Sequence, residues 1–515
     1  DMKKLFSLFA VMAMTAIISQ SLFSQTYLTE DFESAWSGSP AAPPGWTQSR
    51  VVLFGTGTPV GVNTNGEKDW QRNVFSGGVW STASTYNAGG PASAQSGTGV
   101  LFMEDGYFGS TSTCYGSRRV ESSSFNLTTA TTPYARFYYN FNAASTNVNV
   151  QVMASSDGGT TWNCIQVITG NALVTSTGWT RINVLIPAAY RTATCKIGFQ
   201  LTNTWGSNNV WIDNLAVQEF TPTTITSTAT GLFTAPGTWV GGVVPTADNN
   251  VVIAAGHTVT VNANIARCQN MTVNGTLTYS TTTTQLLHVF GNMQVAAGGI
   301  FNCFNGVSGR RLYLSGDFSN EGTSNFDVGT SAAFVTTGTG TLFWVGGAHV
   351  FFRNIGTITN SRIPHIYHAN SGGVRYDNPV SIVRVCELLD GPVNPNGNLT
   401  LGVSLVTTST LLNRGWGSFT VAPTWGAGIT SRSLTYNADI VLTGGNPIIK
   451  APALQTTGNE VEIIAAVRTV SGTFTMNTWG NVQLTFPMTS GTASSGSWAF
   501  TRGILLTDAV NLITT

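Results

Sequence analysis

The chain is long enough for two or three domains, and its charge is sparse and balanced. It has 515 residues, of which 23 are basic and 23 acidic, so that only 9% are charged, against roughly 25% in an ordinary globular protein. The zero net charge argues against binding to nucleic acid or anionic lipid, and 42% hydrophobic residues exclude a disordered chain.

The first 24 residues have the three parts of a secretory signal peptide. Lys3 and Lys4 form the charged region, an apolar run covers 5–18, and a small polar stretch ends at Ser24, after which we place the cleavage. No other segment reaches eighteen consecutive apolar residues, so we expect no transmembrane span in the mature chain. The sequence therefore predicts an exported protein that depends on secretion and attachment machinery.

Residues 25–221 are predicted to form a β-sandwich. Segments 135–141 and 147–152 alternate apolar and polar side chains, which is typical of strands with one buried and one wet face. Turn sequences such as 157–159 separate such segments. The recurrence of short strands and turns favours a sandwich over a helical domain.

Several motifs in this half occur in a characteristic order: Asp31-Phe32-Glu33, Gly45-Trp46, Asp69-Trp70, and the stretches 155–162 and 210–217. With them the chain resembles MAM-type jelly rolls and the related cleaved-adhesin modules of secreted Bacteroidetes proteins. The resemblance implies a jelly roll that binds carbohydrate or a cell-surface protein and catalyses nothing. It also implies type IX secretion to the outer face of a Gram-negative envelope.

The same resemblance implies a structural calcium ion between the first and last strands. The acidic positions of the motifs are Glu33, Asp69 and Asp213. Ca²⁺ takes six to eight oxygen ligands, so three convergent carboxylates with added carbonyls would hold it. The alternative interpretation is that Asp213 caps a turn and Glu33 faces solvent.

Five loop aromatics are the predicted ligand-binding residues: Trp80, Tyr86, Tyr107, Tyr115 and Trp205. Gathered at one rim, they would stack on the apolar face of a sugar ring, whereas singly each would anchor its own loop. The stretch 155–162 also matches the Asp-box of sialidase propellers. Because it occurs once and not blade after blade, we interpret it as a stable β-turn.

Cysteines in an exported chain permit disulfides. The six are Cys114, Cys164, Cys195, Cys268, Cys303 and Cys386. Three fall in each half, and we predict the pairs Cys164–Cys195 and Cys268–Cys303. No CxxC is present and no His lies near a Cys at zinc spacing, so a metal–thiolate site is not expected.

The second half is predicted to be a β-solenoid over 231–515, joined to the sandwich by the Thr-rich linker 222–230. The stretch 237–261 resembles the G8-like start of bacterial β-helix domains, with Trp239 in the N-terminal cap. Short strand–turn units follow at uneven spacing, as in coils with variable loops. No cap is recognisable near residue 515, so we expect the solenoid to continue beyond it.

A β-solenoid can also be a polysaccharide lyase or glycosidase, which needs a pair of carboxylates on adjacent coils. Asp317 and Asp327 are the most plausible pair, although a Gly-Asp turn would occupy Asp317 with backbone bonds. The basic candidates are Arg310, Arg311, His257, His365 and His368. His365 and His368 would share a ligand only outside a regular strand. No GxSxG, HExxH, P-loop or dinucleotide motif occurs in a fitting context, and no catalytic residue is predicted.

The sequence therefore predicts an all-β, secreted cell-surface protein of adhesin type. Its jelly-roll sandwich would bind a glycan or a protein partner, and its β-helix-like solenoid would act as a spacer or interaction surface. Two alternatives stay open. One is a polysaccharide-degrading enzyme that the jelly roll targets to its substrate, and the other is a structural subunit of a surface filament.

Overall fold

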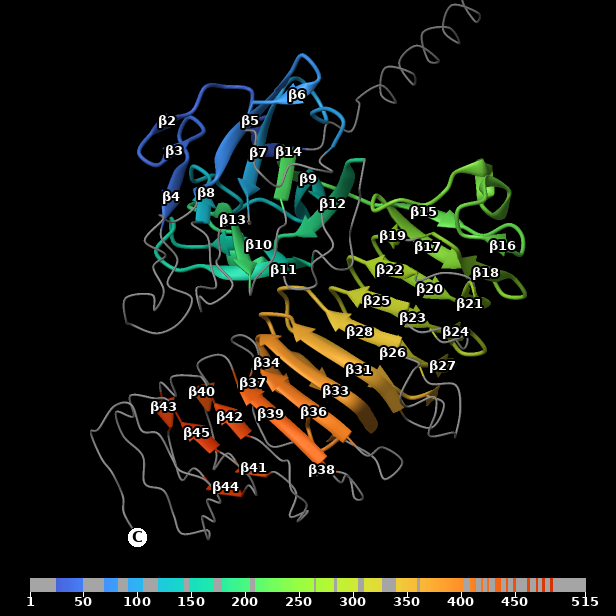
Figure 1. Ribbon diagram of the computed structural model, residues 1–515. Coiled ribbons are helices and arrows are strands. Elements are labelled where there is room, and N and C mark those ends of the chain that lie inside the picture. The colour runs from blue at the N-terminus through green and yellow to red at the C-terminus, as the bar shows by residue number, and fades with distance from the viewer. Residues whose placement is uncertain are drawn as a thin grey trace, which may run out of the picture.

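In this computed structural model, the described residues form β-strands joined by turns and short 3-10 turns, which confirms the predicted all-β class (Figure 1). The structure describes residues 25–49, 69–81, 91–104, 119–142, 148–169, 178–203, 209–263, 265–281, 285–303, 310–326, 340–358, 362–401 and short strands between 408 and 484. The predicted signal peptide lies outside these ranges. Within them, no helix is long and apolar enough to cross a membrane.

The N-terminal part is a sandwich of two antiparallel sheets. Sheet A has the order β12 (Thr180–Leu185), β9 (Pro133–Asn142), β14 (Asn209–Glu219), β7 (Gly99–Glu104), β5 (Gln71–Ser76) and β6 (Val79–Trp80), with β1 (Thr26–Glu30) on β14. Sheet B has the order β11 (Asn163–Thr169), β10 (Val148–Ser155), β13 (Lys196–Asn203), β8 (Arg119–Glu121) and β4 (Thr47–Ser49). The small hairpin β2 (Ser37–Gly38) with β3 (Ala41–Ala42) and the 3-10 turn η2 (Ala188–Tyr190) complete it.

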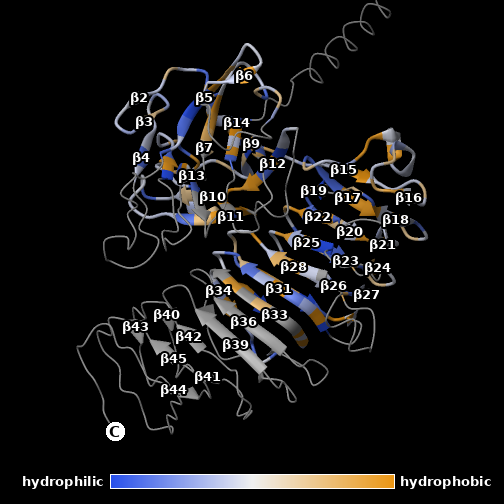
Figure 2. Cartoon of the chain, in the orientation of Figure 1, coloured by the Kyte–Doolittle hydropathy of each residue, from blue (hydrophilic) through white to orange (hydrophobic). Residues whose placement is uncertain are grey.

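The alternation in the sequence sets the core of this sandwich. On β9, Phe137 and Phe141 are fully buried between the sheets, and on β10 so are Val150 and Val152. Figure 2 shows the resulting mixture of hydrophobic and hydrophilic residues along the sandwich strands. The predicted strand faces are confirmed, because side chains of a strand point alternately to its two sides.

The second part consists of stacked coils whose strands form three parallel ladders. Ladder 1 runs β15 (Thr223–Thr226), β17 (Asn249–Ile253), β20 (Met271–Val273), β23 (Met293–Val295), β26 (Phe318–Asn320), β29 (Val350–Asn354), β32 (Val374–Tyr376), β34 (Pro392–Asn394) and β37 (Ser418–Phe419). Ladder 2 runs β16 (Gly231–Leu232), β18 (Thr258–Val261), β21 (Thr276–Tyr279), β24 (Ile300–Asn302), β27 (Thr323–Asn325) and β30 (Thr357–Ile358). The turns η3 (Pro236–Thr238) and η4 (Val240–Gly242) precede β17.

Ladder 3 is the longest of the three. It runs β19 (Ile265–Cys268), β22 (Leu286–Val289), β25 (Arg310–Leu314), β28 (Gly340–Trp344), β31 (Arg362–Ala369), β33 (Val380–Asp390), β36 (Thr408–Asn413), β39 (Ser431–Tyr436), β42 (Val461–Ile463) and β45 (Val482–Leu484). A branch adds β35 (Leu399–Leu401) and β38 (Thr424–Trp425), and two small parallel pairs are β40 (Val441–Leu442) with β43 (Thr469–Val470) and β41 (Ile448–Lys450) with β44 (Thr475–Asn477).

Stacking in register fills the interior of the coils. Leu287, Leu312, Leu342 and Ile366 lie directly above one another on ladder 3, and none of them has any exposed surface. Each strand is too short to bury its apolar side chains alone, so neighbouring coils supply the rest of the core. This arrangement is that of a parallel β-solenoid.

The predicted linker 222–230 is wrong in part, because it contains the first strand of the solenoid. β15 pairs with β17 at four consecutive positions, from Thr223 with Asn249 to Thr226 with Val252. Ile225 points into the solenoid core. Thr is β-branched and favours extended strands, so a Thr-rich run without large apolar residues can still be a strand.

The sandwich and the solenoid share one hydrophobic core. The buried cluster between sheets A and B also contains residues of the outer face of ladder 3, namely Leu286, Phe290, Tyr313, Val345 and Ala369. The solenoid therefore closes the open edge of the sandwich between β11 and β12. The two parts are predicted as separate domains from the sequence, but their packing makes them one unit.

The main chain also crosses this boundary. The N–H of Val167 on β11 donates to the carbonyl of Val345 at 2.8 Å, and Gln166 forms a β-bridge with Gly346. A Cβ on Gly347 would overlap the main chain of Ile165, so only glycine permits this approach. Sheet A also contacts the solenoid, because Arg136 of β9 forms an ion pair with Asp248 at 2.9 Å.

Candidate functional site

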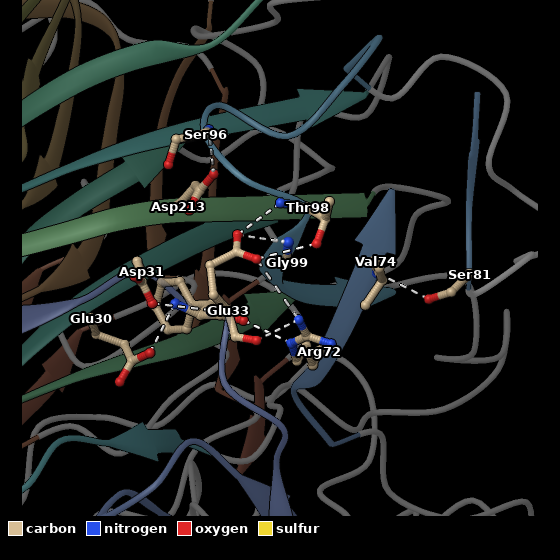
Figure 3. A network of polar contacts seen from close by, with 11 residues as sticks. Glu30, Asp31, Glu33, Arg72, Val74, Ser81, Ser96, Thr98, Gly99 and Asp213 are labelled. Carbon is tan, nitrogen blue, oxygen red and sulfur yellow. Dashed lines mark hydrogen bonds and ion pairs between the residues drawn. The ribbon is translucent and has the colours of Figure 1, made fainter. Parts of the chain in front are cut away.

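Two of the predicted calcium-binding acids hold the same loop of the sandwich (Figure 3). Glu33 Oε1 accepts the main-chain N–H groups of Thr98 and Gly99 at 2.8 and 2.9 Å. Asp213 Oδ2 accepts those of Gln95 and Ser96 at 3.0 and 3.2 Å. Segment 95–99 is therefore held by two carboxylates, that of Glu33, which follows β1, and that of Asp213 on β14.

This acid pair is electrostatically strained. Burial, together with the negative charge of Glu33, raises the pKa of Asp213 to about 7, although hydrogen bonds from main-chain N–H groups act to lower it. Phe32 and Asn214, next to the two acids, have positive φ angles of 58° and 53°, which are uncommon for residues other than glycine. Such strain persists where the surrounding structure enforces it, and it gathers at functional sites.

The third predicted calcium ligand does not join this pair. Val74 of β5 opposes Gly99, whereas Asp69 precedes the other end of that strand. Arg72 lies nearer and donates to the carbonyls of Phe32 and Glu33 at 2.8 and 2.6 Å. Among the described residues, no group of three or more His, Cys, Asp or Glu side chains is arranged to hold a metal ion. The described residues therefore do not form the predicted three-acid site.

Of the five predicted ligand-binding aromatics, the structure describes only Trp80; Tyr86, Tyr107, Tyr115 and Trp205 lie outside the described residues. Trp80 is partly buried on the outer face of sheet A, where it packs on Trp211 and Phe75. Its indole N–H donates to the carbonyl of Pro91 at 3.1 Å. This environment favours loop anchoring, the alternative that the sequence left open, and the ligand role of Trp80 stays a prediction.

A polar row crosses the outer face of sheet B. Gln151, Gln200 and Arg119 lie directly opposite one another on β10, β13 and β8. Gln200 Nε2 donates to Gln151 Oε1 at 3.1 Å, and Arg119 pairs with Glu121 at 2.9 Å. Gln200 is 2% exposed, yet its Oε1 has no hydrogen-bond partner in the described part of the chain. A buried polar atom of this kind costs free energy unless something binds to it.

Trp162 lies beside this row and is oriented by the predicted β-turn. Asp157 accepts hydrogen bonds from the N–H and hydroxyl of Thr161, and Trp162 Nε1 donates to the carbonyl of Gly159 at 2.9 Å. The interpretation of this stretch as a stable turn is confirmed. The guanidinium of Arg119 lies 4.3 Å from the centre of the Trp162 ring, and Gly198 leaves room for both side chains.

The row could not be singled out from the sequence. The alternation around Gln151 predicts that this residue points away from the core, but an outward position on a strand is ordinarily wet. Its burial, and that of Gln200, depends on what lies over the sheet. Trp162 is visible in the sequence only as part of a turn motif.

The predicted disulfides are wrong. Cys195, Cys268 and Cys303 are free thiols, so neither Cys164–Cys195 nor Cys268–Cys303 forms. Cys268 belongs to ladder 3, whereas Cys303 follows a strand of ladder 2, and both fill the solenoid core. Burial raises the pKa of each of these two thiols above its usual range.

The described solenoid residues that were candidates for catalysis belong to regular strands or form hydrogen bonds that stabilise the coils. Asp317 Oδ1 accepts the N–H of Phe351 at 2.8 Å, as expected for its turn, and Asp327 lies outside the described residues. His365 and His368 belong to the regular strand β31 at positions that face opposite sides, so they do not converge.

The remaining basic candidates are also tied to the fold. His257 Nδ1 lies 2.9 Å from the hydroxyl of Ser227, which joins the first two coils. Arg310 is fully buried and bonds the carbonyl of Ser280, while Arg311 pairs through its main chain with Leu286. These contacts do not bring the candidate residues together at one site.

The start of the solenoid is recognisable by family. Residues 238–303 match the G8 domain. This G8 segment includes Trp239, whose buried ring packs edge-on against Phe233 at 5.2 Å and whose N–H donates to the carbonyl of Phe233. The predicted G8-like opening is confirmed. No curated protein sequence matches the chain.

Solved structures similar to the sandwich include binding modules and an enzyme. The K1 cleaved adhesin domain of Lys-gingipain from Porphyromonas gingivalis W83 has 16% identity, covers 38% of this chain and 100% of its own, and gives a TM-score of 0.25. The CBM22-1 xylan-binding domain of Paenibacillus barcinonensis Xyn10C has 12% identity, covers 38% of this chain and 94% of its own, and gives a TM-score of 0.21. A cyclase from Fischerella sp. TAU has 10% identity, covers 39% of this chain and 93% of its own, and gives a TM-score of 0.20. Similarity at this level is too low to transfer a function.

Proposed function

We propose that this protein is an adhesin-like binding protein of the cell surface. Its sandwich binds a glycan or a protein partner, and its solenoid holds the sandwich away from the surface. The observation that carries the proposal is the shared core of the two parts. Because the solenoid closes the edge of the sandwich between β11 and β12, it fixes that module rigidly, while the side chain of Glu33 at the 95–99 loop stays partly exposed.

Calcium is part of this proposal. Glu33 and Asp213 would share the ion, since Asp69 lies at the other end of β5. A divalent cation would offset the repulsion between the two carboxylates and supply the charge compensation that Asp213 lacks. In this role the ion stabilises the 95–99 loop and takes part in no reaction.

The proposed binding is tested with the chain 25–515, because the shared core argues against testing the sandwich alone. The chain is applied to an array of neutral and acidic glycans and to an array of extracellular-matrix proteins, with calcium or with EDTA. Saturable binding to a defined glycan or to a defined protein of the array is the expected result. Absence of binding in both conditions would contradict a binding role of the sandwich.

The predicted export and surface attachment form a separate part of the proposal. Intact cells that make the protein are treated with proteinase K, and the chain is followed by immunoblotting. Loss of the chain from intact cells is expected for a protein on the outer face of the envelope. Protection until the cells are lysed would contradict this location.

A further inference from the structure

The end of the solenoid at its first coil carries an exposed apolar surface. Seven large hydrophobic side chains are exposed in the described part of the chain, and three of them, Leu232, Val240 and Val243, belong to the short stretch 232–243. Their exposed fractions are 47%, 58% and 54%. The other four lie on separate strands and turns, where single exposed hydrophobic residues are ordinary. We call the surface formed by Leu232, Val240 and Val243 the cap patch.

The loop that carries the cap patch is compact and closes the end of the solenoid. The carbonyl of Leu232 accepts the N–H of Ala235 at 3.0 Å and the hydroxyl of Thr238 at 2.8 Å. On the inner side, Phe233 and Trp239 fill the end of the solenoid core. Figure 2 shows hydrophobic residues in this loop next to β16. Because the carbonyl at the strand edge is already bonded, the loop offers apolar side chains to a partner and not an edge for a further strand.

The absence of charge around the cap patch restricts its partner. Residues 220–247 contain no Asp, Glu, Lys, Arg or His. A charged partner would lose hydration against this surface without compensation. Attachment to a lipid surface ordinarily uses Lys or Arg beside the apolar groups, and this stretch has neither. The partner surface that fits is therefore itself uncharged and apolar.

A polar rim lies beside the apolar residues. Asn262 follows β18 in the next coil, and its Nδ2 donates to the hydroxyl of Thr234 at 2.8 Å. Thr234 itself is exposed. An apolar centre with a polar rim is the usual composition of a specific protein interface.

We propose that the cap patch binds the cap patch of a second copy of this chain. A two-fold rotation places the same residues against themselves, so an uncharged apolar surface is complementary to itself. Such a contact is closed and gives a dimer and not a filament. The dimer joins two chains at their first coils and does not depend on what the sandwich binds.

The size of the cap predicts the strength of this dimer. Twelve of the residues 231–246 are at least partly exposed, whereas a stable interface uses roughly 20–30 residues on each side. The contact therefore belongs to the weak class, with a dissociation constant on the order of 10 μM. We expect the dimer to form reversibly as the protein concentration rises.

The test is sedimentation velocity of the chain 25–515 between about 1 and 100 μM, the range that brackets this dissociation constant. Val240→Asp and Val243→Asp each place a carboxylate in the cap patch. Ile355→Asp is the matched control, because it makes the same change at a side chain that is 78% exposed outside the patch. Thermal melting verifies that each variant is folded.

We expect the wild type and Ile355→Asp to dimerise alike. In Val240→Asp and Val243→Asp the dissociation constant should rise by at least about a hundredfold, because the dimer would bury two unpaired carboxylates. A monomeric wild type throughout the range would overturn the proposal. A dimer that survives both patch variants would overturn it too, as would equal loss of the dimer in Ile355→Asp.

Phosphatidylcholine vesicles are the probe for a lipid occupant of the same surface. We expect the wild type not to co-sediment with them. Vesicle binding by a monomeric wild type that Val240→Asp abolishes would assign the cap patch to lipid and overturn the dimer. All these outcomes are separate from binding on the glycan and protein arrays, so failure of the dimer leaves the proposed function intact.

Discussion

At the scale of single residues, buried ionisable groups are the most informative feature. The chain has few charges, so each one away from water needs a specific reason. Asp213 holds a loop beside a second carboxylate, and His288 lies between the sandwich and the solenoid with both ring nitrogens unbonded. The pKa of Asp213 is raised, so this site loses stability as the pH rises, whereas the pKa of His288 is lowered, so that site loses stability as the pH falls. The two sites can therefore be separated by experiment.

Asp213→Asn should abolish a pH dependence of stability. The pKa of Asp213 is about 7 in the folded protein and 3.8 ordinarily, so the folded state holds the proton more tightly. Stability is then fully present below about pH 4 and falls as the pH rises to about 7. Asn mimics the protonated acid, so without calcium the variant should be more stable than wild type at pH 8 by roughly 2 kcal/mol. Urea unfolding at pH 5 and pH 8 measures this.

Calcium supplies the control for this prediction. It should stabilise the wild type at pH 8 and have little effect on the variant, because one of the two shared carboxylates is gone. Equal stabilisation of both proteins by calcium would place the ion elsewhere.

His288→Phe should remove a loss of stability in acid. Burial lowers the pKa of His288 well below its ordinary value, and the charge of Arg267 lowers it further. The unfolded chain therefore takes up a proton below about pH 6.5 and the folded chain does not, so stability is lost as the pH falls through this range. Phe fits among Phe290 and Tyr313, which already contact the ring. Melting temperatures between pH 4.5 and 7.5 should converge for the two proteins at neutral pH and diverge in acid; parallel curves would contradict the assignment.

At the scale of elements, side chains in the turns join one coil to the next. Asn270, Asn292 and Asp317 each precede a strand of ladder 1, and each accepts the main-chain N–H of the following coil at 2.8 to 2.9 Å. Asn270 also donates to Asn250 of the preceding coil at 2.7 Å. This column satisfies main-chain donors at corners where the ladders are interrupted.

Asn270→Ala should lower the free energy of unfolding by about 1 to 2 kcal/mol, because it deletes one bond to each neighbouring coil. Asn270→Asp keeps the acceptor for Asn292 and loses only the donor to Asn250, so its effect should be smaller. Gln294→Ala, on an exposed position of β23, is the control and should lie within about 0.5 kcal/mol of wild type. Equal effects of all three in urea unfolding would show that the column contributes nothing specific.

At the scale of the whole molecule, the shared core decides how the protein behaves as a unit. Residues from sheet A, sheet B and ladder 3 form one cluster, and main-chain bonds join β11 to the solenoid. The two parts are therefore joined by side-chain packing and by main-chain hydrogen bonds, and not by a linker alone. In Figure 1 the sandwich accordingly lies against the upper coils of the solenoid.

Gly347→Ala should weaken this junction. The added Cβ meets the main chain of Ile165, which cannot move aside as a side chain tip could. We expect a loss of about 1 to 3 kcal/mol in unfolding free energy and unfolding of the two parts in separate steps. Gly237→Ala, where a Cβ meets nothing within 4 Å, should leave one transition at the wild-type position. Two steps in the control as well would contradict the role of Gly347.

Sequence by itself determined the β class, the sandwich strands, the G8 segment and the turn at 155–162. These follow from local patterns, because alternation sets the face of a strand and turn residues set its ends. The prediction of a linker at 222–230 was wrong in part, because a Thr-rich strand and a Thr-rich linker have the same composition and only the pairing partner distinguishes them.

Only the tertiary structure decided which residues meet. The disulfide prediction was wrong because the spacing of cysteines along the chain does not show which ladder carries each of them. The separation of Asp69 from Glu33 and Asp213, the row around Gln200 and the shared core all depend on residues far apart in sequence. Such contacts depend on strand order and on what covers an outer face, and neither is encoded in a local pattern. Chemistry and burial coincide at these places, which is why the binding proposals rest on the folded chain.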